Sequence, residues 1–189
     1  MSSFPLFRGR LLLDASSVIS LVASGRVDEM LAALPVRACV IDITRRQEIR
    51  YIWSGPEPNV RQRREAIDLQ PLINRGLLSE VSLDFDETVT MVNLAAQNLG
   101  NGESAATAIA LHRGWGVCTD DFEALPRLRR YAPKVVFLAT SQIIQQWAIE
   151  SAASDDTIHE VLRSMRMRGG YGISTRDVLV AWLQSYATT

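Results

Sequence analysis

Short apolar runs alternate with stretches of helical periodicity along most of this chain. The apolar runs are rich in leucine and β-branched residues, and they have the length of buried strands. They occur at residues 11–14, 38–43, 77–83, 116–119 and 135–138. A regular alternation of strands and helices is typical of a parallel sheet that is covered on both faces. The pattern therefore predicts an α/β fold with three layers, α/β/α, and a central parallel sheet.

The helices between these strands are predicted from their caps and breakers. A hydroxyl or acidic residue before an apolar stretch indicates a helix start, and glycine or proline indicates its end. We predict helices over residues 16–24 with Ser16 or Ser17 as the cap, 27–34, 45–53 after Thr44, 61–75, 86–99, 103–111, 122–131 and 142–151. In the helix over 86–99, the residues expected to face inward are Val89, Val92, Leu94 and Ala95.

The last part of the chain departs from this alternation. Residues 157–168 and 175–186 have helical spacing, are joined by Gly169-Gly170-Tyr171-Gly172, and have Ser174 or Thr175 as the predicted second cap. We therefore predict a main domain over residues 1–150 and a C-terminal helical hairpin over 151–189, packed on that domain or on a partner subunit. A DNA-reading helix-turn-helix is the alternative, but its second helix would be mostly apolar, with Arg176 as its basic residue.

Acidic residues stand where two of the apolar runs end and where a helix of small residues begins. Asp14 ends the first run, Asp120 and Asp121 follow the fourth, and Glu103 opens the helix. The carboxyl ends of parallel strands meet at one edge of the sheet, where open α/β folds place their active sites. Converging carboxylates repel each other unless a cation joins them, and hard oxygen ligands suit Mg²⁺ or Mn²⁺. The sequence thus predicts a metal-dependent site.

Composition narrows the class of protein without identifying a partner. The 189-residue chain is 47% hydrophobic and 22% charged, and its net charge of −1 provides no global field that would attract nucleic acid. Without a long apolar stretch or a signal peptide, we expect a cytoplasmic protein with no membrane partner. Cys39 and Cys118 lie in apolar runs and are expected to be core residues.

Four acidic motifs follow one another along the chain at suitable spacing. They are Leu12-Leu13-Asp14-Ala15-Ser16, Gln47-Glu48-Ile49, Gly102-Glu103-Ser104-Ala105-Ala106 and Thr119-Asp120-Asp121-Phe122. No single motif is specific, but their order resembles that of the PIN-domain ribonuclease family over about residues 10–145. The tail, with Leu162-Arg163 before Gly172-Ile173-Ser174, is similar to a toxin-like subgroup of short bacterial and archaeal PIN proteins that end in a helical hairpin.

This resemblance implies a Mg²⁺- or Mn²⁺-dependent endoribonuclease, typically the toxin of a toxin–antitoxin module. It implies that Asp14, Glu103 and Asp121 hold the metal, with Asp120 as the alternative to Asp121. Glu48 would complete the catalytic cluster, directly or through a water. Paired cations of this kind can activate a water and stabilise the departing oxygen of a phosphodiester. The implied partners are RNA, a small antitoxin protein and a second copy of the chain.

Hydroxyl and basic residues near the acids complete the predicted site. Ser16 and Thr119 would orient the ligating carboxylates through hydrogen bonds. The arginines expected to hold RNA phosphates are Arg45, Arg46 and Arg50, with Arg61, Arg63 and Arg64 nearby. Tyr51 and Trp53 could stack an unpaired base. The alternative is an ordinary charged helix face, with Trp53 in the core or in a dimer contact.

Each acid also has a purely structural interpretation. Asp14 and one of the two adjacent aspartates would cap helices, Glu103 would complement a helix dipole, and Glu48 would belong to a solvated ion-pair face. Two other functional classes remain open. An aspartyl-phosphate phosphatase normally needs a second Asp where this chain has Ser16. A non-catalytic PIN-like module would bind nucleic acid or a protein partner.

Overall fold

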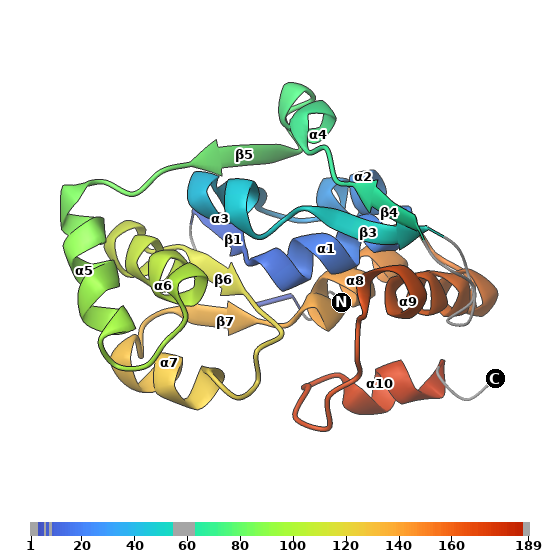
Figure 1. The fold of residues 1–189 in the computed structure, drawn as a ribbon. Coiled ribbons are helices and arrows are strands. Elements are labelled where there is room, and N and C mark those ends of the chain that lie inside the picture. Colours follow the sequence, from blue (N-terminus) through green and yellow to red (C-terminus); the bar gives the residue numbers. More distant parts are fainter. Residues whose placement is uncertain (1–3, 6, 8, 55–62, 187–189) are drawn as a thin grey trace.

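The central sheet is built from the predicted apolar runs. The computed structural model describes residues 4–186 apart from residues 6, 8 and 55–62. Within this part of the chain, five parallel strands form the central sheet in the order β5-β2-β1-β6-β7 (Figure 1). Their bounds are β1 Arg10–Leu13, β2 Arg37–Ile41, β5 Leu78–Val81, β6 Gly116–Cys118 and β7 Val136–Leu138. The predicted central parallel sheet is thus confirmed.

The strand order reverses in the middle of this sheet. β1 pairs with β2 on one side and with β6 on the other, so Leu12 is opposite both Cys39 and Val117. The chain places β2 and β5 on one side of β1, then returns to place β6 and β7 on the other. In open parallel sheets, ligands bind in the crevice beyond the carboxyl ends of the strands at such a point. A site is therefore expected beyond the ends of β1 and β6.

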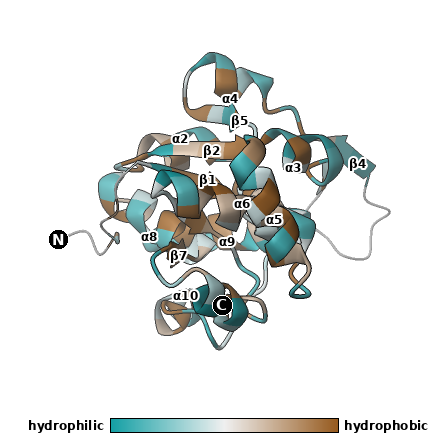
Figure 2. Cartoon of the chain, turned by 90° about the vertical axis from the view of Figure 1, so that its left-hand side faces the viewer, coloured by the Kyte–Doolittle hydropathy of each residue, from teal (hydrophilic) through white to brown (hydrophobic). Residues whose placement is uncertain are grey.

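Helices cover both faces of the sheet, which gives the expected α/β/α layers. Side chains alternate along a strand, so Leu11 and Leu13 face one layer while Leu12 faces the other. The first layer contains α1 Ala15–Ala23, α2 Val27–Ala32, α8 Thr140–Glu150 and α9 Asp155–Gly169. The second contains α5 Phe85–Ala95, α6 Asn101–Arg113 and α7 Leu125–Tyr131. Figure 2 shows apolar colouring on the strands between these layers, and Cys39 and Cys118 are buried there as predicted.

The outer face of α5 carries residues that the sequence pattern placed inside. Leu94 is buried as predicted, but Val89 and Val92 are 48% and 60% exposed, which contradicts their expected inward position. They share an apolar stripe with Phe85, which is 80% exposed. These apolar residues point outward because Glu87, on the other face of α5, is fully buried.

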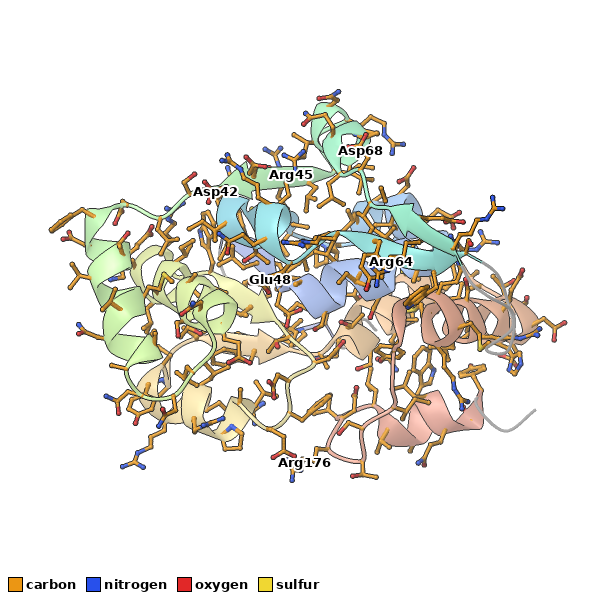
Figure 3. All side chains as sticks on the ribbon, viewed as in Figure 1. Asp42, Arg45, Glu48, Arg64, Asp68 and Arg176 are labelled. Carbon is orange, nitrogen blue, oxygen red and sulfur yellow. The ribbon has the colours of Figure 1, made fainter. Side chains whose placement is uncertain are left out.

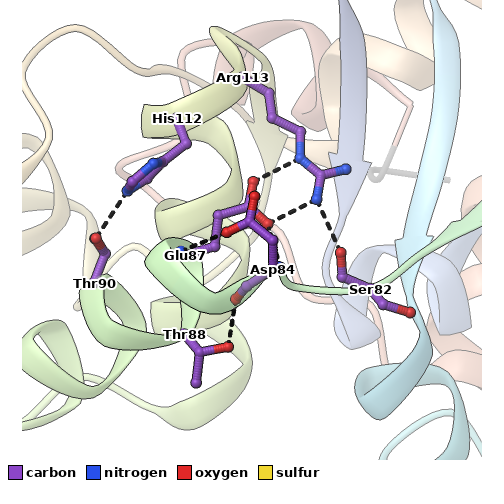
Figure 4. Close-up of polar contacts among 7 residues, drawn as sticks. All are labelled: Ser82, Asp84, Glu87, Thr88, Thr90, His112 and Arg113. Carbon is purple, nitrogen blue, oxygen red and sulfur yellow. Dashed lines mark hydrogen bonds and ion pairs between the residues drawn. The ribbon is translucent and has the colours of Figure 1, made fainter.

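Glu87 is buried in an ion pair that joins α5 to α6 (Figure 4). Its carboxylate accepts from the Arg113 guanidinium at 2.6 and 2.7 Å, and Arg113 also donates to the Ser82 carbonyl oxygen at 2.9 Å. Asp84 caps α5 by accepting from the Glu87 amide at 2.8 Å. Arg113 lowers the pKa of Glu87 more than burial raises it, so the pair stabilises the fold above the usual glutamate range.

The segment after β2 differs most from the prediction. The helix predicted over residues 45–53 is wrong, because α3 covers only Asp42–Gln47 and starts before Thr44, which is not its cap. Tyr51–Ser54 forms strand β3 instead. Tyr, Ile and Trp favour extended backbone when a partner strand is present.

That partner strand is β4, Arg63–Ala66, which pairs antiparallel with β3. The helix predicted over residues 61–75 is therefore also wrong, since the described helix in this part is α4, Gln70–Asn74. The alternating charges of this segment resembled those of an amphipathic helix, but they belong to an exposed strand of the hairpin. The predicted loop over 55–59 and Arg61 lie outside the described residues.

The tail contains two helices, as predicted, but with a longer connection. α9 packs on α1, where the Ser164 hydroxyl donates to the Ala23 carbonyl oxygen at 2.7 Å. α10, Val180–Ser185, begins after Leu179 without a side-chain cap, so the predicted caps Ser174 and Thr175 are wrong. Residues 170–179 form the connection, in place of the glycine tract alone. Across the described residues, we find no helix with both the length and the apolar character that a membrane span requires.

Candidate functional site

A cavity lined by four acids opens at the edge of the sheet where the carboxyl ends of the strands lie. Its volume is about 330 Å³, and its carboxylates belong to Asp14, Glu48, Glu103 and Asp121. We call it the acidic cavity. The acids come from four separate segments: the end of β1, the end of α3, the first turn of α6 and the loop after β6. The fold thus brings together four of the five acids named by the sequence motifs, all but Asp120.

Asp14 is both a helix cap and a residue of the acidic cavity. Its Oδ1 accepts from the Ser17 amide at 2.7 Å, so Asp14 itself is the N-cap of α1, and the predicted caps Ser16 and Ser17 are wrong. The Ser16 hydroxyl donates to the carboxylate at 3.0 and 3.1 Å. These contacts fix the carboxylate beyond the end of β1. The structural and the functional interpretation of Asp14 are therefore compatible.

Glu103 enters the cavity from the first turn of α6. Its Oε2 accepts from the Gly100 amide at 3.1 Å, which holds the carboxylate near the start of the helix. Burial raises the pKa of Glu103, and so do its hydrogen bond with Asp121 and the charges of Asp121 and Asp14, against the Gly100 contact. Negative charge is therefore concentrated around this carboxylate.

Glu48 lies at the C-terminal end of α3, not within a longer helix as the motif suggested (Figure 3). Its carboxylate rests against Gly102, where an added Cβ would lie 3.0 Å from Oε1 and 3.3 Å from Oε2. Burial raises the pKa of Glu48, and the charge of Asp14 raises it further. Gly102, which directly precedes Glu103, therefore leaves the space that the Glu48 carboxylate occupies. In the sequence, the glycine directly before Glu103 is the signal for this role.

The two adjacent aspartates point in different directions. Asp121 lines the acidic cavity, and its Oδ1 accepts from the Glu123 and Ala124 amides at 2.9 Å each. Burial raises the pKa of Asp121, but the hydrogen bonds from Ala124 and Glu103 lower it to below its usual value. Thr119 is buried, and its hydroxyl oxygen accepts from the Asp121 amide at 3.2 Å.

Asp120 turns away from the acidic cavity toward the start of α8. Its Oδ1 accepts from the Thr140 amide at 2.8 Å, while Oδ2 has no hydrogen-bond partner among the described residues. Burial raises the pKa of Asp120 to about 6, despite the opposing contacts with Thr140. The geometry therefore favours Asp121 as the acid of the cluster.

The donors of the acidic cavity have the chemistry that a hard divalent cation requires. The lining contains four carboxylates and, among the described residues, no lysine or arginine. Carboxylate oxygens are preferred by Mg²⁺ and Mn²⁺. In the present side-chain positions, however, no three His, Cys, Asp or Glu residues of the described chain are arranged so that they could hold a metal ion. Metal binding would therefore require some of these side chains to change position.

The predicted RNA-binding arginines do not line the acidic cavity. Arg45 forms an ion pair with Glu80 of β5 and donates to Gln70 at 3.0 Å. Arg46, which belongs to α3, and Arg50, which follows this helix, are both exposed. Arg50 also donates to the Gln47 carbonyl oxygen at 2.8 Å.

An aromatic and basic cluster lies on the hairpin formed by β3 and β4. Tyr51 and Trp53 pack edge to face with ring centroids 5.4 Å apart. Arg64, which Figure 3 labels, has its guanidinium over both rings, 4.4 Å from the Tyr51 centroid and 5.6 Å from the Trp53 centroid. Trp53 is 36% exposed and is therefore not a core residue. Arg168 of α9 joins the hairpin through the Trp53 carbonyl oxygen at 3.2 Å.

Comparison with known proteins gives no family for this chain. No protein-family model and no curated protein matches the sequence. The functional proposal below is therefore based on the acidic cavity and on the motifs that supply its residues.

If the protein cleaves RNA, as the resemblance implies, replacing Gly102 by Ala should lower that activity without lowering thermal stability. The added Cβ would press on the Glu48 carboxylate, while alanine is the better helix former by about 1 kcal/mol. A misplacement of about 1 Å in a catalytic site can cost on the order of 100-fold in rate, so a shift of a few tenths of an ångström in Glu48 is expected to cost roughly tenfold or less. We would measure RNA cleavage and melting temperature, and repeat both in a Glu48→Ala background. A similar loss in that background would show that Gly102 does not act through Glu48.

Proposed function

We propose that this protein is a Mg²⁺- or Mn²⁺-dependent endoribonuclease with a PIN-like site. The observation that carries the proposal is the acidic cavity itself, where four segments supply four carboxylates at the strand-order reversal. The raised pKa values of Glu48 and Glu103 support it. Burial is their first cause and the charge of neighbouring carboxylates adds to it, and a bound cation would offset both effects.

The residues of the cavity would have distinct roles. Asp14, Glu103 and Asp121 would hold the metal, and Glu48 would complete the cluster. Ser16 and Thr119 would keep Asp14 and the Asp121 backbone in place through the hydrogen bonds described above. When bound, divalent cations would supply an activated water and would stabilise the departing oxygen of the phosphodiester.

RNA is the proposed substrate and a toxin–antitoxin module the proposed setting. Arg46, Arg50 and the Tyr51–Trp53–Arg64 cluster are exposed or half-buried and could contact phosphates and unpaired bases. A small antitoxin protein and a second copy of the chain are proposed partners from the resemblance, with the tail as a helical hairpin at the contact. Light scattering would test for a dimer, and a monomeric mass in solution would contradict it.

A metal-dependence assay tests the proposal. End-labelled single-stranded RNA, duplex RNA and single-stranded DNA would be incubated with the protein in Mg²⁺, in Mn²⁺ or in excess EDTA. We expect internal cleavage of single-stranded RNA in either metal and none in EDTA. Cleavage that persists unchanged in EDTA would rule out the proposed mechanism.

A second candidate is a non-catalytic module that binds nucleic acid or a protein partner. It is favoured by one observation: the described acids are not arranged for metal binding in their present positions. In this case the protein would bind RNA equally well with and without metal and would leave it intact. The same assay therefore separates the two candidates.

A further inference from the structure

Positive charge is concentrated in the segment that follows the acidic cavity along the chain. Residues 122–134 contain one acidic residue and four basic residues, whereas the whole chain has 20 basic and 21 acidic residues. The acid, Glu123, is already paired with Arg176 at 2.6 Å. The four basic residues are exposed, and none of them forms an ion pair with a carboxylate of the described chain. We call them the basic surface: Arg127, Arg129, Arg130 and Lys134.

The helix α7 presents most of these charges on its outer side. Its inner side is apolar, since Leu125 and Leu128 are buried in a cluster with residues of α5 and α6. Arg127 and Arg130 are three residues apart, so they lie one turn from each other on the same side of the helix. The basic surface is therefore a consequence of how α7 packs on the second helical layer.

The first turn of α7 lies next to the acidic cavity. Asp121 lines the cavity and accepts from the amide of Ala124, the residue at which α7 is capped, at 2.9 Å. Arg127 donates to the Asn98 carbonyl oxygen at 3.2 Å, and Asn98 is two residues before Gly100, which also lines the cavity. Burial raises the pKa of Asp121, and the charge of Arg127 is among the effects that lower it. Arg127 is thus the part of the basic surface beside the acidic cavity.

From there, α7 leads away from the acidic cavity. It connects the end of β6 to the start of β7, and these two strands are parallel, so the chain must return to the opposite edge of the sheet (Figure 1). Seven residues of helix span about 10 Å. Lys134 lies two residues before β7, at the far end of this path. The basic surface therefore extends from the acidic cavity along the whole of α7.

An exposed aromatic residue on α7 favours RNA over an acidic protein segment as the partner. Tyr131 is 39% exposed, and its hydroxyl donates to Gln97 Oε1 at 3.0 Å, which fixes the position of the ring. Proteins that hold single-stranded nucleic acid combine cations that follow the backbone with aromatic rings on which bases stack. An acidic protein segment would need the cations alone.

We infer that the basic surface holds the phosphates of single-stranded RNA where the strand leaves the acidic cavity, with Arg127 and Arg130 as phosphate contacts and Tyr131 stacking on a base. The inference rests on the proposed function, because the acidic cavity supplies the reason for choosing RNA. It also provides the cations that the cavity lacks, since no described lysine or arginine lines it. Such phosphate contacts position a strand without reading its sequence.

Two charge-matched double variants test the basic surface. Arg127→Gln/Arg130→Gln removes two of its charges, and glutamine forms helices about as well as arginine. The control, Arg37→Gln/Arg75→Gln, removes two exposed charges that precede or begin β2 and β5, at the sheet edge opposite the acidic cavity. A general effect of net charge would be the same in both variants. Melting temperatures show that both are folded.

RNA binding in EDTA provides the first test. An end-labelled, unpaired RNA of about 20 nucleotides would be titrated with the full-length protein at several salt concentrations. Each phosphate contact to a single strand contributes about −0.7 to the slope of log K against log salt, so two contacts account for about 25-fold in affinity at 0.1 M salt. We expect the α7 double variant to show this loss and a smaller slope, and the control to stay within about threefold of the wild type. An unchanged slope in the α7 variant would overturn the inference.

Poly-L-glutamate of similar length separates RNA from an acidic protein partner. Tyr131→Leu should weaken RNA binding by about fivefold or more, through the loss of one stacked base, and leave polyglutamate binding unchanged. If polyglutamate binds the wild type as tightly as RNA does, and Tyr131→Leu weakens neither, the surface fits an acidic protein segment and the inference is wrong.

Cleavage kinetics separate a failure of the inference from a failure of the proposed function. With Mg²⁺, the α7 double variant should raise KM for RNA more than it lowers kcat, because contacts to phosphates outside the cut bond are the same in the ground state and the transition state. If RNA is cut but KM and the salt slope are unchanged, the basic surface is wrong and the nuclease stands. If RNA binds with the expected salt dependence but is cut in neither Mg²⁺ nor Mn²⁺, the nuclease is wrong and the RNA-binding surface stands.

Discussion

Replacing Asp14 by Asn should lower RNA cleavage by about 10³-fold or more and leave the fold intact. The variant removes a charge from the acidic cavity, and each 1.4 kcal/mol of lost transition-state stabilisation costs about tenfold in rate. Asparagine caps helices as well as aspartate does, so the contact with the Ser17 amide can persist. We would compare single-turnover rates and melting temperatures.

Asp84→Asn is the matched control for this experiment. Asp84 is also a helix N-cap, accepting from the Glu87 amide at 2.8 Å, but it lies outside the acidic cavity. It should keep both activity and stability. Full activity of Asp14→Asn, or equal losses in the two variants, would show that the charge of Asp14 has no special role in cleavage.

The two adjacent aspartates should respond differently to the same substitution. Asp121→Asn is expected to lower cleavage by about 10²-fold or more, because it removes a cavity charge while its oxygen can still accept from Glu123 and Ala124. Asp120→Asn should change the rate by less than about tenfold, because Asp120 does not line the acidic cavity and the asparagine oxygen can still accept from the Thr140 amide. A larger loss in Asp120→Asn would reassign the metal ligand to Asp120.

Asp120→Asn should also stabilise the fold at high pH. The pKa of Asp120 is raised to about 6 in the folded protein, so its charged form costs stability above that pH, and the cost disappears as the pH falls toward the usual aspartate range. The asparagine variant should therefore be more stable than the wild type at pH 8, by up to about 3 kcal/mol, with little difference near pH 4. Denaturant unfolding of both proteins in EDTA at pH 8 and near pH 4 measures this difference in stability.

The strands and the positions of the acids could be predicted from the sequence because each depends on neighbouring residues in the chain. An apolar run such as Leu11–Leu13 has few alternatives to a buried strand, and an acid directly after it must lie at the sheet edge. The order of Asp14, Glu103 and Asp121 along the chain then places them together once the sheet is parallel.

Features that depend on distant partners could not be read in this way. Tyr51–Ser54 forms a strand because Arg63–Ala66 pairs with it. Val89 is exposed because Glu87, on the other face of the same helix, is buried in its ion pair with Arg113. The opposite directions of Asp120 and Asp121 also depend on remote groups. The Thr140 amide holds Asp120, and no spacing in the sequence shows that this amide lies beside it.

Crystals of the wild type soaked in Mn²⁺ would test the central claim most directly, through the anomalous scattering of the metal. We expect an anomalous peak in the acidic cavity, with carboxylate oxygens of Asp14, Glu103 and Asp121 as ligands and Glu48 turned toward it. Asp14→Asn crystals treated in the same way should lose the peak. A wild-type map with no peak in the acidic cavity at saturating Mn²⁺ would contradict the proposed metal-dependent nuclease.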